Sequence, residues 1–285
     1  MKAVSSRNAR ERRVGVVTDV DGCILDHHYR LGPARATLVW LRRRGVPVIL
    51  CTSKTRSELS ALARELGFAL PAIVESGTAI LVPSGTLVPR APAAGLWTPD
   101  GLLVPLAVPI AQVRAGLEEI ARATGGQVRG FGAMTNAEIA RLTGLEGGAV
   151  ARARAREFDE PFLWTADPRP HRAAIRQILG RHRLAITRGA RFHHLHGRTD
   201  KGRAVRVVRG WLAAAAGAPV ALLGLGDGPH DFTLLSAVDY PVIVPRPDGS
   251  VEPSLARLRR ARRAPAAGPK GWSAAVRQAL ALPGP

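Results

Sequence analysis

Short apolar runs alternate with segments bounded by proline or glycine over the first third of the chain. The apolar runs over 13–20, 46–53 and 72–77 have the length of buried strands. Between them, segment 33–44 starts with a proline and precedes a glycine, and segment 55–67 ends in a glycine, as helices do. This alternation predicts an α/β fold with a Rossmann-like parallel sheet core and helices on both faces.

The pattern changes near Leu87, where a Pro- and Gly-rich stretch begins. The segments that follow predict a second α/β unit, with strands over 102–108, 161–166 and 186–197, and helices over about 110–123, 135–144, up to Arg156, and 170–182. The alternation of strands and helices then resumes, with a helix over 199–217, a strand over 219–227, a helix over 230–238, a strand over 240–244 and an amphipathic helix over 268–282.

These segments predict a core domain that is interrupted by an inserted domain. The expected parts are a basic N-terminal tail (1–13), the first part of the core (14–86), an inserted α/β cap domain (87–197), and the second part of the core with a basic C-terminal helix (198–285). A chain of 285 residues is long enough for one large domain or two modest ones.

The net charge of +19 raises the possibility of a nucleic-acid partner. However, 11 of these 19 charges lie in residues 1–13 and 255–285, and the basic residues are almost all arginine. Aromatic residues, on which bases could stack, make up only 5% of the chain. We therefore expect a solvated basic surface and no nucleic-acid partner; a basic nucleic-acid-binding protein with an inactive enzyme fold is the alternative from another functional class.

The sequence predicts a cytoplasmic protein without a membrane partner. No apolar stretch approaches the ~20 residues that span a bilayer, and the charged N-terminus lacks the apolar segment of a secretory signal. The two cysteines, Cys23 and Cys51, are too few for a disulfide framework, so we expect reduced thiols.

Polar side chains follow three of the predicted core strands, at the point where each strand ends. Asp19 and Asp21 follow the first strand, Thr52 and Ser53 end the second, and Asp227 follows the strand over 219–227. Each of these residues alone is typical of a turn or a helix N-cap. Because ligands bind outside the carboxyl ends of parallel strands, we expect these side chains to meet at one edge of the sheet.

Grouped carboxylates need a cation, because like charges a few ångström apart raise one another's pKa and destabilise the fold. Oxygen ligands with room for water favour Mg²⁺. The hydroxyl groups of Thr52 and Ser53 could bind a phosphate group that completes the site. The chain has only four lysines, and Lys54 and Lys201 accompany these strand ends, where a compact positive charge would balance the acids.

These motifs resemble those of the haloacid dehalogenase (HAD) superfamily of phosphatases. DVDG matches its first motif, the Thr-Ser strand end its second, the lysine in TDKG its third and GDGPHD its fourth, and the inserted domain resembles a C2-type cap. The segments CTSKT, REFDEPF, GARFHHLHGRTDKG and GPKGW further resemble the mannosyl-3-phosphoglycerate phosphatase family. The resemblance covers roughly residues 14–285.

The resemblance implies a role for each motif residue. Asp19 would be the nucleophile that forms an aspartyl-phosphate, and Asp21 would be the general acid and base. Asp19, Asp21 through its backbone carbonyl, and Asp227 would hold Mg²⁺. The remaining roles are phosphate binding by Thr52 and Ser53, charge balance by Lys201, and support of the metal ligands by Asp231.

The cap would select the substrate. Arginine suits both the carboxylate and the phosphate of a phosphoglycerate, which makes Arg156 and Arg191 candidates. Glu157 is a weaker candidate for accepting hydrogen bonds from sugar hydroxyl groups, as are Asp159 and Glu160. An ordinary salt bridge is the alternative for each of these residues.

Three positions depart from the pattern of the superfamily. Cys23 stands where threonine is common, Ser76 where relatives often have asparagine, and His230 where asparagine is common in the fourth motif. A zinc site at His194 and His196 lacks an evident third ligand, and GLGDG lacks the full spacing of a dinucleotide-binding loop.

The sequence as a whole predicts a Mg²⁺-dependent phosphatase whose substrate is mannosyl-3-phosphoglycerate or glucosyl-3-phosphoglycerate, as in mannosylglycerate biosynthesis. The alternative within the same class is a broader sugar-phosphate phosphatase. The preferred sugar depends on the orientation of one hydroxyl group, so neither this preference nor the oligomeric state follows from the sequence.

Overall fold

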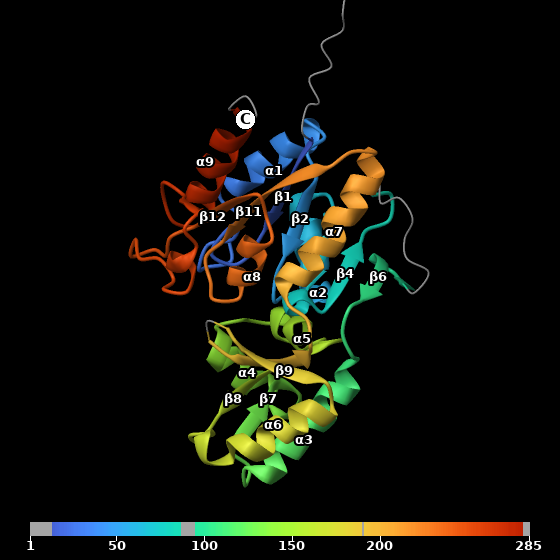
Figure 1. Cartoon of the computed structure of the whole chain (residues 1–285), viewed down its shortest axis with the longest axis vertical. Helices are drawn as coiled ribbons and strands as arrows, with labels where there is room; N and C mark the ends of the chain where they lie inside the picture. Colours follow the sequence, from blue (N-terminus) through green and yellow to red (C-terminus); the bar gives the residue numbers. More distant parts are fainter. Residues whose placement is uncertain (1–12, 87–94, 190, 282–285) are drawn as a thin grey trace, which may run out of the picture.

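The computed structural model describes residues 13–86, 95–189 and 191–281, which form two α/β parts stacked along the long axis of the molecule (Figure 1). The first part is built on a nine-stranded sheet with the order β13-β12-β11-β1-β2-β3-β4-β6-β5. The second part is built on a four-stranded sheet with the order β7-β8-β10-β9. The predicted basic tail lies almost entirely outside the described residues.

The strands of the nine-stranded sheet are β1 (Arg13–Thr18), β2 (Val48–Cys51), β3 (Ala72–Val74), β4 (Ala79–Val82), β5 (Leu96–Thr98), β6 (Gly101–Pro105), β11 (Val220–Gly226), β12 (Tyr240–Ile243) and β13 (Arg262–Arg263). Those of the four-stranded sheet are β7 (Val128–Gly130), β8 (Asp159–Trp164), β9 (Leu184–Arg188) and β10 (His193–Gly197).

The helices around the first sheet are α1 (Ala34–Arg43), α2 (Arg56–Leu66), α7 (Lys201–Ala216), α8 (Asp231–Ser236) and α9 (Gly268–Ala281). Those of the second part are α3 (Ile110–Ala123), α4 (Asn136–Thr143), α5 (Gly148–Arg154) and α6 (Arg172–Arg181). Short 3₁₀ turns are η1 (Glu75–Gly77), η2 (Phe131–Ala133), η3 (Arg169–His171) and η4 (Leu255–Arg257).

Six strands of the nine-stranded sheet, from β13 to β3, pair in parallel, which confirms the predicted fold class. The sheet then continues through β4, β6 and β5, which pair antiparallel and were not predicted as part of it. The strand predicted over 102–108 therefore extends the first sheet as β6. The change from one sheet to the other thus does not coincide with the predicted domain boundary at residue 87.

Apolar side chains bury both faces of the first sheet. On one face, Leu38 and Leu41 of α1 pack with Trp272 of α9 in one core cluster. On the other face, Val205 of α7 and Leu234 of α8 belong to a second cluster. Because helices cover each face, most residues of the central strands β1, β2, β3 and β11 are buried, and the carboxyl ends of the parallel strands open towards the second part of the molecule (Figure 1).

The second sheet is covered by α3 and α6 through a third apolar cluster, which includes Val113, Phe162 and Ile178. Helices α4 and α5 pack through a separate cluster around Ile139 and Val150. Helix α5 lies between the second sheet and the first part of the molecule (Figure 1). There the hydroxyl of Thr55 donates a hydrogen bond of 2.9 Å to the carbonyl of Arg152.

Two predicted strands are wrong in extent. The segment 186–197 forms two antiparallel strands, β9 and β10, joined by a turn in which the N–H of Gly189 donates to the carbonyl of Phe192 at 2.8 Å. The strand predicted over 72–77 ends at Val74, because Glu75 and Ser76 adopt positive φ angles of 45° and 65° that an extended strand cannot contain.

Helix signals in the sequence acted as expected. Thr55 and Glu58 form a capping box at the start of α2, and Gly67 ends this helix with a φ of 82°.

Both cysteines are buried and unpaired. Within the described ranges, no helix combines the length and the apolar character that crossing a membrane requires.

Candidate active site

The carboxyl ends of β1, β2 and β11 bring the predicted acidic residues together. Asp19 directly follows β1, and Asp227 directly follows β11, the strand that pairs with it. One carboxylate oxygen from each of Asp19, Asp227 and Asp231 lies within 4.8 Å of the others. The strand order therefore creates an acidic group at one edge of the sheet, as the sequence predicted.

Lys201 lies at the centre of this group. Its ammonium donates hydrogen bonds to Asp19 Oδ1 at 2.9 Å and to Asp231 Oδ1 at 2.7 Å. The residue is 3% exposed, and the two carboxylates raise its pKa well above the usual value in spite of its burial. Its position follows from Asp200, which caps α7 and thereby fixes the first turn of the helix.

The carboxylates destabilise one another's charges. Burial, followed by the charge of Asp231, raises the pKa of Asp19 to about 7. Burial and the charge of Asp19 likewise raise the pKa of Asp227 well above its usual range. One ammonium does not balance three acids, so this site suits a further cation with oxygen ligands.

The local backbone is shaped around Asp227. Gly22 has a φ of 72°, and a Cβ atom at this position would lie 2.1 Å from Asp227 Oδ2. Asp231 Oδ2 accepts hydrogen bonds from the backbone N–H groups of Asp227 and Gly228, both at 3.0 Å. Both oxygens of Asp231 are thus occupied by protein donors, which suits a residue that orients the loop.

The other predicted core residues surround this acidic group. Asp21 forms an ion pair of 3.1 Å with Lys54, and its side chain remains 41% exposed. Thr52 is fully buried, and its hydroxyl accepts a hydrogen bond from the N–H of Lys54 at 3.1 Å. Ser53 follows on the same turn after β2. The carboxylate of Asp21 is therefore partly exposed and pairs with Lys54.

The predicted cap residues do not all meet the site. Arg156 does, because its guanidinium donates to the carbonyl of Ser53 at 2.7 Å. Glu157 instead pairs with Arg56 of α2 at 3.1 Å. Arg191 is exposed and donates to the carbonyl of Thr143 within the second part of the molecule.

The sequence analysis missed Glu75, which is fully buried. Its carboxylate accepts hydrogen bonds from the backbone N–H groups of Glu157, Phe158 and Asp159, with distances between 2.8 and 3.2 Å. The signal was present in the sequence, because Glu75 is a further polar residue at the end of a buried strand, β3.

A second missed residue is Trp272 of α9, which is fully buried behind β1. Its indole N–H donates to the hydroxyl of Thr18 at 2.8 Å, and this hydroxyl donates to the carbonyl of Asp19 at 2.7 Å. The chain of hydrogen bonds holds the backbone of Asp19 in place. Because Trp272 and Thr18 have no exposed surface, these hydrogen bonds replace contacts with water that the buried groups cannot make.

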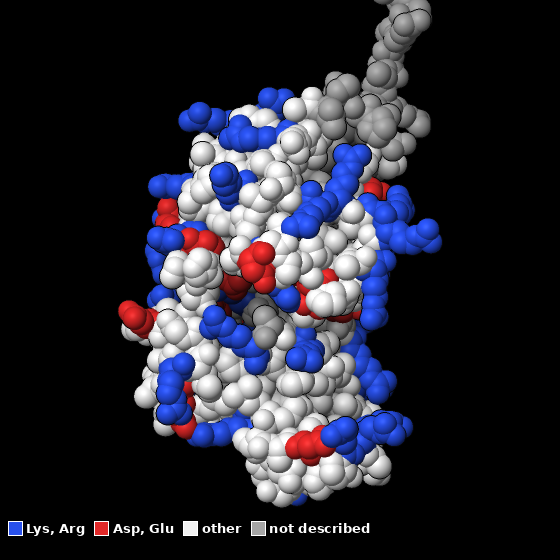
Figure 2. All heavy atoms as spheres, turned by 90° about the vertical axis from the view of Figure 1, so that its left-hand side faces the viewer, with Lys and Arg blue, Asp and Glu red and all other residues white. Residues whose placement is uncertain are grey.

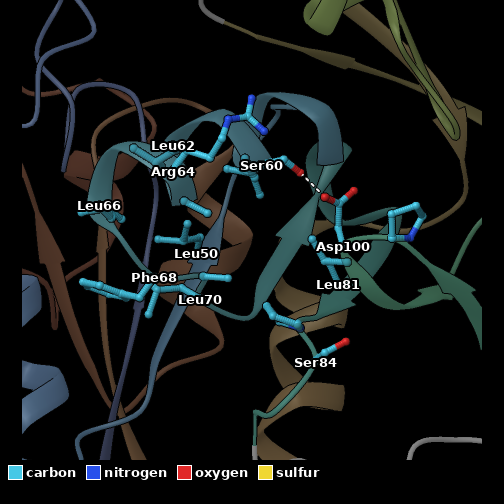
Figure 3. A pocket seen from close by; sticks show the side chains of 15 residues that line it. Leu50, Ser60, Leu62, Arg64, Leu66, Phe68, Leu70, Leu81, Ser84 and Asp100 are labelled. Carbon is cyan, nitrogen blue, oxygen red and sulfur yellow. Dashed lines mark hydrogen bonds between the residues drawn. The ribbon is translucent and has the colours of Figure 1, made fainter.

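Figure 2 shows acidic side chains gathered at the waist between the two parts, with Lys and Arg spread over both. A separate cavity of about 340 Å³ lies beside α2 and is lined by apolar side chains such as Leu50, Leu62 and Phe68 (Figure 3). A hydrogen bond of 2.6 Å from Ser60 to Asp100 lies at its side (Figure 3). This cavity contains none of the predicted site residues.

The chain is similar to curated phosphatases over almost its whole length. It is 32% identical to the glucosyl-3-phosphoglycerate/mannosyl-3-phosphoglycerate phosphatase of Methanococcoides burtonii, with 92% of this chain and 95% of the relative covered. It is 31% identical to the protein of the same name from Persephonella marina, with the same coverage. The mannosyl-3-phosphoglycerate phosphatase of Pyrococcus furiosus is 28% identical over 80% of this chain and 90% of its own. A scan against protein-family models finds no match.

Solved structures share the fold. A HAD superfamily phosphatase from Bacteroides thetaiotaomicron superposes with a TM-score of 0.62 at 16% identity, covering 92% of this chain and 94% of that one. The sucrose-phosphatase from Synechocystis superposes with a TM-score of 0.56 at 15% identity, covering 95% and 97%. These likenesses show that the chain shares the fold of HAD phosphatases.

Proposed function

Because this chain belongs to the family of glucosyl-3-phosphoglycerate/mannosyl-3-phosphoglycerate phosphatases, we propose that it dephosphorylates one or both of these glycosylated phosphoglycerates. The chain is a phosphatase, and its substrate is a phosphorylated small molecule. The observation that carries the proposal is the contact of Lys201 with Asp19, in the same group as Asp227, in a chain of which 92% matches such a relative. The product would be the free glycosylglycerate.

In the first step, a carboxylate oxygen of Asp19 attacks the phosphorus atom of the substrate. The bond between phosphorus and the glycerate oxygen breaks, and the leaving oxygen takes a proton from Asp21. The partial exposure of the Asp21 side chain supports this role. Lys201 favours the ionised form of Asp19, because its ammonium donates to the attacking carboxylate and opposes the rise in its pKa.

In the second step, Asp21 accepts a proton from water, and the oxygen of this water attacks the phosphorus atom of the aspartyl-phosphate. The bond from phosphorus to Asp19 breaks, so that phosphate leaves and the free carboxylate is restored. Thr52 and Ser53 would bind the phosphate oxygens throughout, and Arg156 would hold the turn that carries Ser53 through its carbonyl.

Mg²⁺ fits this site on three observations. The grouped side chains offer oxygen ligands, burial and neighbouring carboxylates raise the pKa values of Asp19 and Asp227, and Gly22 leaves the space that the carboxylate of Asp227 occupies. Asp19, the backbone carbonyl of Asp21, and Asp227 would hold the ion. A bound Mg²⁺ would supply positive charge against the phosphoryl oxygens.

The second part of the molecule, built on the four-stranded sheet, would select the substrate as a cap. Its contacts with the core through Arg156 and Thr55 support a cap that closes over the phosphate site. Such a phosphatase would release a small, soluble glycosylglycerate in the cytoplasm, as part of mannosylglycerate biosynthesis or of the corresponding glucosyl route.

Phosphate release with Mg²⁺ tests the proposal. The substrates would be glucosyl- and mannosyl-3-phosphoglycerate, 3-phosphoglycerate and hexose phosphates, with Asp19→Asn as the inactive variant and the exposed Asp248→Asn as its matched control. We expect rapid release from the glycosylated phosphoglycerates, lost in Asp19→Asn and kept in Asp248→Asn. Equal rates on hexose phosphates would instead identify a broader sugar-phosphate phosphatase.

A further inference from the structure

A buried polar cluster lies where the cap meets the core. His194 of β10 and Asp159 of β8 contribute from the cap, and their Nδ1 and Oδ2 atoms are 2.8 Å apart. From the core, Ser76 donates to the same Oδ2 at 3.5 Å. The ring of His230, which directly precedes α8, meets the ring of His194 edge-on, with 5.1 Å between their centroids.

Two buried atoms of this cluster are without a hydrogen-bond partner among the residues that the structure describes. They are Oδ1 of Asp159, a residue with no exposed surface, and Nε2 of His230. A buried polar atom left unpaired costs stability, so native proteins pair nearly all of them with protein, water or a ligand. One unpaired atom from the cap and one from the core, in the same cluster, point to a shared ligand.

The cluster borders the phosphate site on two sides. His230 directly precedes Asp231, which accepts a hydrogen bond from Lys201. On the other side, the Arg156 guanidinium lies 3.6 Å from Asp159 Oδ2 and donates to the carbonyl of Ser53. A group joined to the phosphate of a bound substrate would therefore reach this cluster.

We propose that Asp159 Oδ1 and His230 Nε2 bind hydroxyl groups in the sugar of the substrate and so determine the preference for a glycosylated phosphate ester. This inference rests on the proposed function and names the residues that recognise the sugar. A hydroxyl can donate to the carboxylate and pair with the imidazole through the same or a neighbouring oxygen. A carboxylate of the substrate would be repelled by Asp159, which excludes the glycerate carboxyl group from this place.

The state of Asp159 suits an acceptor. Burial raises its pKa, but the contacts with His194 and Arg156 outweigh burial and leave the pKa below its usual value. The carboxylate is therefore ionised, and Oδ1 offers a full acceptor to a donor that enters the cluster. Hydrogen bonds from hydroxyl groups to a desolvated carboxylate discriminate strongly against ligands that lack the hydroxyl.

The experiment compares two substrates in matched variants. For each protein, kcat/KM is measured with glucosyl-3-phosphoglycerate and with 3-phosphoglycerate, and the ratio of the two reports sugar recognition. His230→Phe keeps a ring but removes the nitrogen, His230→Gln keeps a polar end, and Asp159→Asn removes the charge. The exposed Asp167→Asn is the control. Inhibition by glucosylglycerate, which lacks phosphate, is measured alongside.

We expect the ratio to fall at least tenfold in His230→Phe and in Asp159→Asn, less in His230→Gln, and not in Asp167→Asn. The inhibition constant of glucosylglycerate should rise by a similar factor. If His230→Phe lowers kcat/KM equally for both substrates, or changes neither, the inference is overturned while the proposed function stands. If the wild-type protein hydrolyses neither glucosyl-3-phosphoglycerate nor mannosyl-3-phosphoglycerate, the proposed function itself fails. Should Asp159→Asn not fold, the two His230 variants decide the question.

Discussion

The carboxylate of Glu75 accepts a hydrogen bond of 2.8 Å from the backbone N–H of Asp159, and thereby joins the end of β3 in the core to the start of β8 in the cap. The same carboxylate binds the N–H groups of the two preceding residues, so one side chain holds three successive residues. Asp159 also belongs to the proposed sugar site. The placement of the sugar site therefore depends on a core residue that holds the backbone of Asp159.

Glu75→Gln should loosen this connection. The amide nitrogen would face backbone N–H groups, and at least one buried donor would lose its acceptor. We expect the free energy of unfolding to fall by about 1–3 kcal/mol, and kcat/KM to fall severalfold as the cap loses its position. Chemical denaturation and phosphate release would measure both effects. Glu65→Gln, an exposed residue of α2, is the matched control, and an equal loss in both variants would contradict the proposed connection.

The same residue predicts a pH dependence. Burial, which outweighs the charge of Arg156, raises the pKa of Glu75 from 4.5 to about 7, with a further contribution from Asp159. Between these values the folded protein binds more protons than the unfolded chain. The contribution of Glu75 to stability is therefore complete below pH 4.5 and is lost as the pH rises to about 7, on the order of 3 kcal/mol.

This pH dependence is measured as the difference in unfolding free energy between the wild-type protein and Glu75→Gln, which cannot titrate. Denaturation curves at intervals between pH 4 and 8 (roughly, the range in which a raised carboxyl titrates) should show the advantage of the wild type shrinking as the pH rises. A constant difference across the range would mean that folding does not raise the pKa of Glu75.

Much of this arrangement could be predicted from the sequence. The ends of β1, β2 and β11 were recognisable from apolar runs followed by Asp19, Thr52 and Asp227, since parallel strands align their carboxyl ends without further information. The limits of α2 followed from Thr55 and Gly67 for a similarly local reason. Local signals sufficed where the chemistry of the site lies on the strand ends themselves.

Other features could not be predicted because they depend on contacts between distant segments. The contact of Glu75 with residues 157–159 joins positions more than eighty residues apart, and a single buried glutamate does not indicate its partner. The short strands β4 and β5 carry too few residues to show a period. The segment 186–197 was predicted as one strand, because its pattern of polar and apolar residues shows no clear break at Gly189. The structure instead has a turn there, between β9 and β10.

Lys201→Met should abolish activity and destabilise the fold. Removal of the ammonium leaves Asp19 and Asp231 buried without their shared partner, which typically costs about 3–5 kcal/mol. The rate of phosphate release should fall at least about a hundredfold, which is the typical loss when one hydrogen-bond donor is removed from an active site. Lys270→Met, at an exposed position of α9, is the control for the loss of a lysine and should leave both quantities nearly unchanged.

Addition of Mg²⁺ should stabilise the wild-type protein. A ligand that binds only the folded state at about one hundred times its Kd contributes about 2.7 kcal/mol, which raises Tm measurably. Asp227→Asn should lose most of this increase, because it removes one predicted ligand, although relief of the repulsion with Asp19 should raise its Tm in EDTA. Differential scanning calorimetry with and without Mg²⁺ would detect both effects; an equal Mg²⁺ response in the two proteins would place the ion elsewhere.

Gly22→Ala tests the shape of the same site without changing a charge. The added Cβ would meet the carboxylate of Asp227 at a φ of 72°, so this side chain must move away from Asp19. Gly45→Ala has a similar φ of 65° but nothing within 4 Å of the new atom, so it carries the backbone strain alone. We expect both variants to lose about 1 kcal/mol of stability from this strain, but only Gly22→Ala to lose the rise in Tm with Mg²⁺ and the release of phosphate. Loss of both functions in Gly45→Ala would mean that backbone strain, and not the displacement of Asp227, is responsible.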